Sequence, residues 1–334
     1  MSTDIAKLNL KLFTDTVECV PTRFGFGEGM IQVGKKDARV VALCADLTAS
    51  TKLDGFAKAF PERFVQMGIA EQSMASVASG MAAMGKIPFI ASYAMFSPGR
   101  NWEQIRTTVC YNNVNVKVVG AHAGVSVGPD GGTHQAIEDI ALMRVLPHMT
   151  VVVPCDAEET RKATLALATH VGPTYLRLTR EATPVMTTPD TPFTIGKAQI
   201  FFEPKRGVKK TIGIIGAGPI LYEALVAAKG LEAENIGVSV MNLATIKPFD
   251  TKAVLAFAKA HDAIVTIEEH QIIGGLGSAV AEYLTEAYPI HVVRMGVKDL
   301  FGQSGTPEEL IKHYSMDRES IKMEIRKIKK EMKK

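Results

Sequence analysis

The sequence predicts an α/β protein with two consecutive three-layer α/β domains, of residues 1–190 and 195–334. First, short apolar runs alternate with stretches of helical periodicity, and apolar strands separated by helices are typical of a parallel sheet covered on both faces. Second, the segment from Pro184 to Pro204 is rich in proline and threonine, which is typical of an interdomain linker. Third, a length of 334 residues fits about two domains of ordinary size.

The elements of the first domain follow from this alternation. Strands are expected at Val40–Cys44, Val116–Gly120, Thr150–Val153 and Thr174–Leu178. Helices are expected at Glu71–Met84, Trp102–Tyr111, Gln135–Leu146 and Ala157–His170. Acidic residues follow Asp156, and they mark the start of the last helix because acids favour a helix N-terminus.

The second domain repeats the pattern after Thr211. Its strands are expected near Ile212–Ile215, Val238–Met241, Ala263–Ile267 and His291–Arg294. The final segment, Asp317–Lys334, is dense in lysine. We interpret it as a solvated terminal helix rather than as a nucleic-acid-binding arm.

Composition is that of a soluble globular protein, with 46% hydrophobic and 22% charged residues. The net charge of +3 is too small to indicate a nucleic-acid partner. The N-terminus has no apolar signal core, and no window approaches the ~18 apolar residues of a membrane span. The cysteines are widely spaced, as expected of reduced and partly buried thiols (Cys19, Cys44, Cys110 and Cys155). We therefore expect a cytoplasmic protein that binds neither nucleic acid nor membranes.

The segment Gly216–Leu221 (G-A-G-P-I-L) follows an expected strand and opens a helix, as a dinucleotide-binding loop does. The third glycine of such a loop is missing, and Pro219 removes a backbone N–H that would face a phosphate. Glu234 lies near the spacing of a ribose-binding acid. A tight strand-to-helix turn is the favoured interpretation, and NAD binding is the alternative.

The segment His122–Gln135 (H-A-G-V-S-V-G-P-D-G-G-T-H-Q) combines two histidines, an aspartate and four glycines. The glycines let the backbone approach a ligand closely, and His134 is expected at a helix start with Thr133 as its cap. A transition-metal site usually needs further ligands at close spacing, and none is evident. A polar pocket for a hydroxylated or phosphorylated substrate is favoured over a turn with incidental histidines.

Glu71 is the one charged residue between Arg63 and Lys86, and it precedes an apolar, small-residue helix. An acid in the first turn of a helix complements the helix dipole. A carboxylate among apolar neighbours is also how proton-handling groups are built. The residues alone leave both interpretations open.

Several separated motifs together resemble the C-terminal half of transketolases. They are P-T-R (Pro21–Arg23), A-D-L-T-A-S (Ala45–Ser50), G-I-A-E-Q (Gly68–Gln72), the segment His122–Gln135, E-E-H (Glu268–His270) and G-G-L-G-S (Gly274–Ser278). They occur in the family's order and span nearly the whole chain. The resemblance implies a pyrimidine-binding domain over residues 1–190 and a transketolase C-terminal domain over residues 195–334.

The resemblance implies thiamine diphosphate as the cofactor. Glu71 matches the glutamate that shares a proton with the aminopyrimidine ring. Tyr93 and Phe96 match the aromatic wall beside that ring, and Asp46 matches a residue near the thiazolium. The cofactor, not the protein, supplies the electron sink in such an enzyme.

The resemblance also implies transfer of a two-carbon ketol unit from a ketose phosphate to an aldose phosphate, as in the pentose phosphate pathway. Residues that match the sugar-phosphate contacts of the family are Arg23, Ser50, His134 and Arg180, and those that match its hydroxyl contacts are His122 and Asp130. Arginine suits phosphate geometry. The two histidines are the groups expected to move hydroxyl protons.

The chain departs from the transketolase pattern beside Glu71, where Ala70 and Gln72 replace an arginine and a histidine. This form is closer to deoxyxylulose-phosphate synthases and to β subunits of 2-oxo acid dehydrogenases, which are the alternative functions, while His122 favours transketolase. A nucleotide-binding or non-catalytic regulatory subunit is a further alternative. The intact set of matched site residues argues against it.

The G-D-G motif, with which the family's N-terminal half binds Mg²⁺ and the diphosphate, does not occur in these 334 residues. The resemblance therefore implies a separately encoded N-terminal subunit that carries it, and no metal ligands in this chain. The expected assembly is α₂β₂, with active sites at subunit interfaces.

Overall fold

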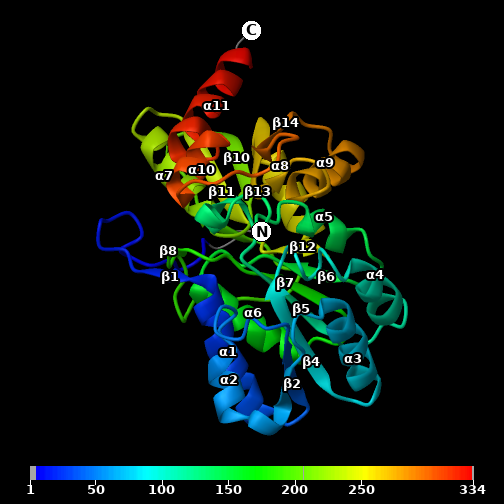
Figure 1. The fold of residues 1–334 in the computed structure, drawn as a ribbon. Coiled ribbons are helices and arrows are strands. Elements are labelled where there is room, and N and C mark those ends of the chain that lie inside the picture. The colour runs from blue at the N-terminus through cyan, green and yellow to red at the C-terminus, as the bar shows by residue number, and fades with distance from the viewer. Residues whose placement is uncertain (1–4, 206, 333–334) are drawn as a thin grey trace.

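The computed structural model describes residues 5–205 and 207–332 and contains one large sheet in each half of the chain (Figure 1). The sheet of the first half has the strand order β12-β6-β7-β5-β4-β2-β3. Its strands are β2 (Val40–Cys44), β3 (Phe64–Gln66), β4 (Ile87–Tyr93), β5 (Lys117–Ala121), β6 (Thr150–Val152), β7 (Thr174–Arg177) and β12 (Thr245–Lys247). All neighbours are parallel except β12, which is antiparallel to β6.

Helices cover both faces of this sheet. They are α1 (Thr22–Lys36), α2 (Asp54–Ala59), α3 (Glu71–Ala83), α4 (Trp102–Gln104), α5 (Asp139–Arg144) and α6 (Ala157–Thr169), with shorter or irregular turns η1 (Pro61–Arg63), η2 (Ile105–Cys110) and η3 (Val125–Asp130). Val41 of β2 packs in a cluster with Met74 of α3, whereas Ala42 packs in another cluster with Phe26 of α1. Successive strand residues point to opposite faces, so two layers of helices enclose the sheet.

The second half has the strand order β14-β13-β10-β11-β9. The strands are β9 (Gln199–Phe202), β10 (Lys210–Gly216), β11 (Gly237–Asn242), β13 (Ala263–Gln271) and β14 (Val292–Val297). Its helices are α7 (Leu221–Glu232), α8 (Thr251–Lys259), α9 (Leu276–Ala287), α10 (Pro307–His313) and α11 (Arg318–Glu331). Ile215 packs with Leu276 of α9, and Ile214 packs with Leu225 of α7, so this sheet is also covered on both faces. The predicted α/β class with three-layer domains is confirmed.

The two halves share structure across the expected linker. β12 comes from the second half and yet extends the first sheet through β6. The linker prediction is wrong for Gln199–Phe202, because these residues form β9 and pair with β11. A small separate sheet joins β1 (Cys19–Pro21) to β8 (Ala182–Pro184). One apolar cluster includes both Leu43 and Ile264, so the core is continuous between the halves.

The predicted helix Gln135–Leu146 begins only at Asp139. The Ala136 carbonyl accepts the N–H of Gly124 at 2.8 Å, and the Gln135 side chain donates to the carbonyls of Val125 and Gln303 at 3.0 and 2.9 Å. These contacts hold residues 134–138 against the preceding loop, so His134 does not start a helix. The predicted helical periodicity gave no sign of these long-range partners.

Two other motifs have structural roles in the second half. β10 ends at Gly216, α7 begins at Leu221 and Gly218 lies at φ +78°, so the glycines form the tight strand-to-helix turn of the favoured interpretation. The Gly218 N–H also donates to the Val153 carbonyl at 3.2 Å and so joins this turn to the first half. Glu234 forms an exposed ion pair with Arg326 at 2.6 Å. α11 is not merely solvated, because it buries one face in the core, through Ile321, Ile325 and Ile328.

The four cysteines are free thiols, with Cys19 exposed and the others buried. Among the described residues, no helix has both the length and the apolar composition needed to cross a membrane.

Lys117 at the start of β5 is fully buried, and its Nζ donates to the carbonyls of His170 and Gly172 at 2.6 and 2.9 Å. Burial lowers the pKa of its ammonium from 10.5 to about 7. The unfolded chain therefore binds this proton more tightly, and the contribution of Lys117 to the free energy of unfolding is present above pH 10.5 and lost as the pH falls toward about 7.

We expect wild-type protein to lose stability relative to Lys117→Met as the pH is lowered across this range. Urea unfolding of both proteins at several pH values measures the difference. The exposed Lys58→Met variant is the control and should show no such trend. A difference between wild type and Lys117→Met that stays constant with pH would contradict the assignment.

Candidate active site

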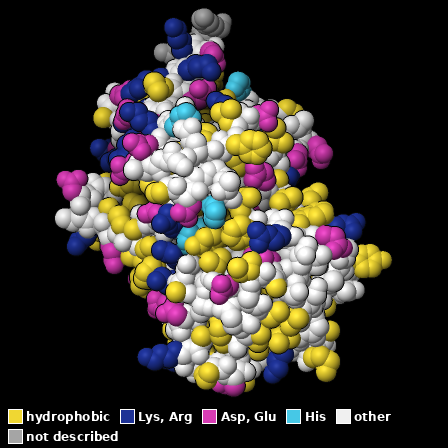
Figure 2. Space-filling view, viewed as in Figure 1, with side chains coloured by type: hydrophobic (Ala, Val, Ile, Leu, Met, Phe, Trp, Pro, Cys, Tyr) yellow, Lys and Arg dark blue, Asp and Glu magenta, His cyan; other side chains and the backbone are white. Residues whose placement is uncertain are grey.

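The candidate residues gather at one edge of the seven-stranded sheet. β2, β4, β5 and β7 are parallel, so their carboxyl ends lie along the same edge. Ser50 follows β2, Tyr93 ends β4, His122 follows β5 and Arg180 follows β7, while Arg23 lies in the first turn of α1. Figure 2 shows histidine and basic side chains together where the two halves of the molecule meet.

Glu71 is the first residue of α3, and only 2% of it is exposed. Its Oε2 accepts a hydrogen bond from Arg100 Nη1 at 3.1 Å, and its carbonyl accepts one from Asn101 Nδ2 at 3.0 Å. Its position suits the helix dipole. An exposed acid would complement the helix dipole equally well. That role therefore does not explain why Glu71 is buried and paired with Arg100.

Aromatic rings line the adjacent surface. Tyr93 stacks on His122 with ring centroids 3.9 Å apart and lies 6.0 Å from Phe96. His134 meets Phe96 edge-on at 5.5 Å. The Arg100 guanidinium lies over the Phe96 ring, 4.5 Å from its centroid. A buried carboxylate and an aromatic face thus hold one planar cation, and the same pair of groups suits a planar nitrogen heterocycle.

Two arginines form a positive rim. Arg23 Nη1 donates to His122 Nε2 at 3.3 Å and to the Ser50 carbonyl at 3.1 Å. Arg180 is partly balanced by two carboxylates, because its Nη1 lies 3.7 Å from Asp130 Oδ1 and its Nε lies 3.6 Å from Glu181 Oε1. Burial, and then the charge of Arg180, lower the pKa of Arg23. Positive groups that repel each other in this way suit an anionic ligand such as a phosphate.

His122 is neutral at ordinary pH. Burial lowers its pKa to about 3, with further contributions from Arg23, Arg180 and His134. Because Arg23 donates to Nε2, the ring proton lies on Nδ1. Nδ1 is buried and has no hydrogen-bond partner among the residues that the structure describes. A buried donor without a partner is expected where a ligand oxygen completes the site.

Asp46 stands one strand away from this group. It follows β2, which pairs with β4 so that Cys44 lies beside Ala91. Its side chain is exposed, and its backbone N–H donates to Gln66 Oε1 at 2.8 Å. Asp46 thus lies at the same edge of the sheet but makes none of the side-chain contacts described above.

The glycine-rich segment packs on the second half of the chain. The Ser126 N–H donates to Glu269 Oε2 at 3.0 Å, and a Cβ at Gly124 would lie 2.5 Å from that oxygen. A Cβ at Gly132 would lie 2.5 Å from the Gly302 carbonyl oxygen. These glycines permit a close approach of the two halves. That they also let the backbone approach a ligand stays a prediction.

The E-E-H and G-G-L-G-S motifs also have structural roles. Glu268 accepts hydrogen bonds from the N–H groups of Leu276 and Gly277 at 2.6 and 2.8 Å, so it caps the start of α9. His270 Nε2 accepts the Ala141 N–H at 3.3 Å and connects β13 to α5. These residues fix the second half against the candidate site.

Sequence reasoning missed Arg100 and the buried ion pair between Arg177 and Asp139, whose Nε and Oδ2 atoms are 2.8 Å apart. Arg177 carried a signal, because it stands in the otherwise apolar strand T-Y-L-R-L. Arg100 carried none, since its sequence neighbours are typical of an exposed loop.

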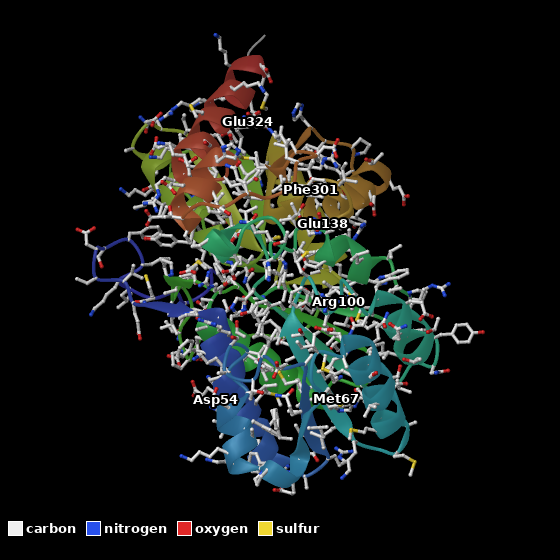
Figure 3. The ribbon with its side chains drawn as sticks, in the orientation of Figure 1. Asp54, Met67, Arg100, Glu138, Phe301 and Glu324 are labelled. Atoms are coloured by element: carbon white, nitrogen blue, oxygen red, sulfur yellow. The ribbon has the colours of Figure 1, made fainter. Side chains whose placement is uncertain are left out.

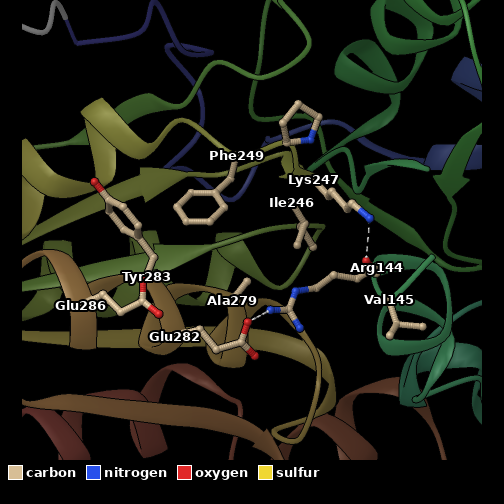
Figure 4. A pocket seen from close by; sticks show the side chains of 10 residues that line it. Arg144, Val145, Ile246, Lys247, Phe249, Ala279, Glu282, Tyr283 and Glu286 are labelled. Carbon is tan, nitrogen blue, oxygen red and sulfur yellow. Dashed lines mark hydrogen bonds and ion pairs between the residues drawn. The ribbon is translucent and has the colours of Figure 1, made fainter. Parts of the chain in front are cut away.

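A cavity of about 560 Å³ lies elsewhere, between α9 and residues 246–249 (Figure 4). Its cationic groups are already engaged: Arg144 pairs with Glu282, and Lys247 Nζ donates to the Arg144 carbonyl at 2.9 Å. No group of three or more metal-ligating side chains suited to a metal ion occurs in the described part of the chain.

Comparisons with known proteins agree with this architecture. The pyrimidine binding domain of transketolase matches residues 18–186, and the transketolase C-terminal domain matches residues 203–321. The chain belongs to the transketolase family.

Several relatives match this chain over nearly their whole length and nearly the whole length of this chain. The putative transketolase C-terminal section of Methanocaldococcus jannaschii is 42% identical over 315 residues, which cover 93% of this chain and 96% of the relative. The 6-deoxy-6-sulfo-D-fructose transketolase subunit SqwH of Clostridium sp. is 39% identical over 292 residues, or 87% of this chain and 89% of the relative. A solved structure described as a split gene transketolase, inactive beta4 tetramer, is 44% identical, with a TM-score of 0.85, over 92% of this chain and 98% of that chain.

The low pKa of His122 predicts its behaviour in solution. Its imidazole signal, followed by NMR and assigned with His122→Gln, should show no titration between about pH 5 and 8. Arg23→Met should raise the pKa of His122, because it removes one of the charges that lower it.

The exposed Arg39, which pairs with Asp37, provides the matched control, and Arg39→Met should leave the titration unchanged. A wild-type midpoint near the ordinary value of about 6.5 would contradict the assignment.

Proposed function

We propose that this chain is the C-terminal subunit of a two-subunit transketolase. With thiamine diphosphate, the complex transfers a two-carbon ketol unit from a ketose phosphate to an aldose phosphate. The observation that carries the proposal is the buried Glu71 carboxylate beside the Phe96 ring, next to a rim of two arginines around a neutral His122.

The cofactor end of the site fits the aminopyrimidine ring. Glu71 and Phe96 already hold a planar cation between them, so they suit a flat ring whose nitrogen carries a proton. Glu71 would hold that proton, and Tyr93 and Phe96 would exclude water from it. When bound, thiamine diphosphate supplies the carbon nucleophile and the electron sink.

The rim would hold the sugar phosphate. Arg23 and Arg180 present charge to an anion, and the Nδ1–H of His122 is free to donate to a substrate oxygen. His134 lies edge-on to Phe96 and to Tyr93, so it borders the aromatic wall. We assign to the two histidines the orientation of substrate hydroxyls and the transfer of their protons.

We propose a separate N-terminal subunit that supplies the Mg²⁺ and diphosphate site, in an α₂β₂ cytoplasmic complex. The similar solved structure is described as an inactive beta4 tetramer, which supports a need for such a partner. The relatives that this chain nearly covers are named as transketolase sections or subunits. We therefore prefer ketol transfer to the pyruvate-dependent alternative.

The test is a ketol-transfer assay of the chain mixed with a candidate N-terminal subunit, with xylulose 5-phosphate or pyruvate as the donor. We expect activity only in the mixture and only with the sugar phosphate. Glu71→Gln should lower kcat by at least ~100-fold, because it removes a proton-holding group from the reacting centre.

Glu62→Gln removes an exposed glutamate from η1 and is the matched control, with full activity expected. Full activity of the isolated chain would refute the two-subunit proposal. Activity with pyruvate alone would favour the synthase or dehydrogenase alternative. Wild-type activity in Glu71→Gln would refute the role of Glu71.

A further inference from the structure

We propose that Arg100 is a positioning residue that gates the cofactor end of the site. In the free chain its guanidinium pairs with the Glu71 carboxylate, and it must move away when an aminopyrimidine ring binds there. This inference rests on the proposed function, because that function places the ring at Glu71.

The ion pair between Arg100 and Glu71 is unequal. The Glu71 side chain is 2% exposed, whereas the Arg100 side chain is 49% exposed and approaches from the surface. Figure 3 shows Arg100 near the level at which the two halves of the molecule meet. The guanidinium therefore has solvent to move into, while the carboxylate has none.

Glu71 is held in place by the backbone of α3, whereas the guanidinium of Arg100 lies at the end of a long side chain. Glu71 begins α3, and its carbonyl is held by Asn101 Nδ2 at 3.0 Å. Arg100 follows Gly99, where a Cβ would lie 2.1 Å from the Met95 carbonyl oxygen, so this tight turn aims the arginine at the site. The movable part is the long arginine side chain beyond that turn.

Arg100 takes up the two contacts that a cofactor ring needs. It pairs with Glu71 at 3.1 Å and covers the Phe96 ring at 4.5 Å. A guanidinium and a protonated pyrimidine are both flat and both donate N–H groups to a carboxylate. They compete for the same place, so ring binding requires the ion pair to break.

The gate also protects the free chain. A buried carboxylate without a counter-ion is unfavourable, and Arg100 supplies the counter-ion until the ring arrives. Because Arg100 is half exposed, the pair is of the moderate strength typical of surface ion pairs. Its presence should weaken ring binding by roughly five-fold, and added salt should lessen this effect by screening the pair.

The experiment uses the full chain and thiamine, which carries the aminopyrimidine ring without the diphosphate. Trp102 is the single tryptophan of the chain and lies two residues after Arg100, with Nε1 donating to the Leu142 carbonyl at 2.8 Å. Its ¹⁵N-indole NMR signal reports binding without any activity. We expect Arg100→Met to bind thiamine roughly five-fold more tightly than wild type, with less dependence on salt.

Two controls isolate the gate. Arg106→Met removes an exposed arginine nearby and should leave thiamine affinity unchanged. In a Glu71→Gln background, Arg100→Met should give no gain, because the ion pair is already absent. Urea unfolding of the two single variants and the double variant without ligand should also reveal coupling between Arg100 and Glu71.

The outcomes separate the inference from the proposed function. Equal thiamine affinity in wild type and Arg100→Met, or a gain that persists in the Glu71→Gln background, would overturn the gate alone. Weaker binding in Arg100→Met would overturn it too, because Arg100 would then help to hold the ring. Absence of thiamine binding in every variant would overturn the cofactor assignment and, with it, the gate.

Discussion

The candidate site depends on one buried ion pair, between Arg177 at the end of β7 and Asp139 at the start of α5. The two side chains are 3% and 1% exposed, and their charged atoms are 2.8 Å apart. Burial alone would raise the pKa of Asp139, but the Arg177 guanidinium holds it below its usual value. Loss of one partner would leave a charge buried alone, which costs about 3–5 kcal/mol. Any arrangement of β7 and α5 that separates the two side chains is therefore unfavourable.

That arrangement determines where the glycine-rich segment lies. Arg177 Nη2 also donates to the carbonyls of Ala136 and Glu269 at 3.1 and 2.8 Å, so it joins the end of this segment to β13. Glu269 in turn accepts the Ser126 N–H in the middle of the segment. His122 precedes both anchors, and His134 lies between Ser126 and Ala136. The second half of the chain thus holds the histidines at the sheet edge without contributing to the charge of the rim.

The elements whose positions depend on local sequence pattern were predicted correctly. β2 and the start of α6 lie where the apolar run and the acidic cap indicated. The motif L-R-L-T-R-E shows the limit of such reasoning, because it contains two arginines three residues apart. Only Arg180 was recognised, although Arg177 organises the site, and its partners lie 38 and 92 positions away in the chain. Partners at such separations leave no mark on local periodicity. The late start of α5 has the same cause.

Charge divides the site into two parts. At the cofactor end, Glu71 carries one negative charge and Arg100 balances it, so a flat ring that takes over from Arg100 meets a matched partner. At the rim, Arg23 and Arg180 surround an imidazole that burial keeps neutral, so their positive charges are not cancelled by it. An anion is attracted to the rim, whereas at the other end Arg100, or the ring that replaces it, already balances Glu71 and leaves no net positive charge for an anion. Under the proposed function, this asymmetry fixes the direction of the sugar phosphate: its phosphate lies at the arginines, and its carbonyl end points toward the cofactor.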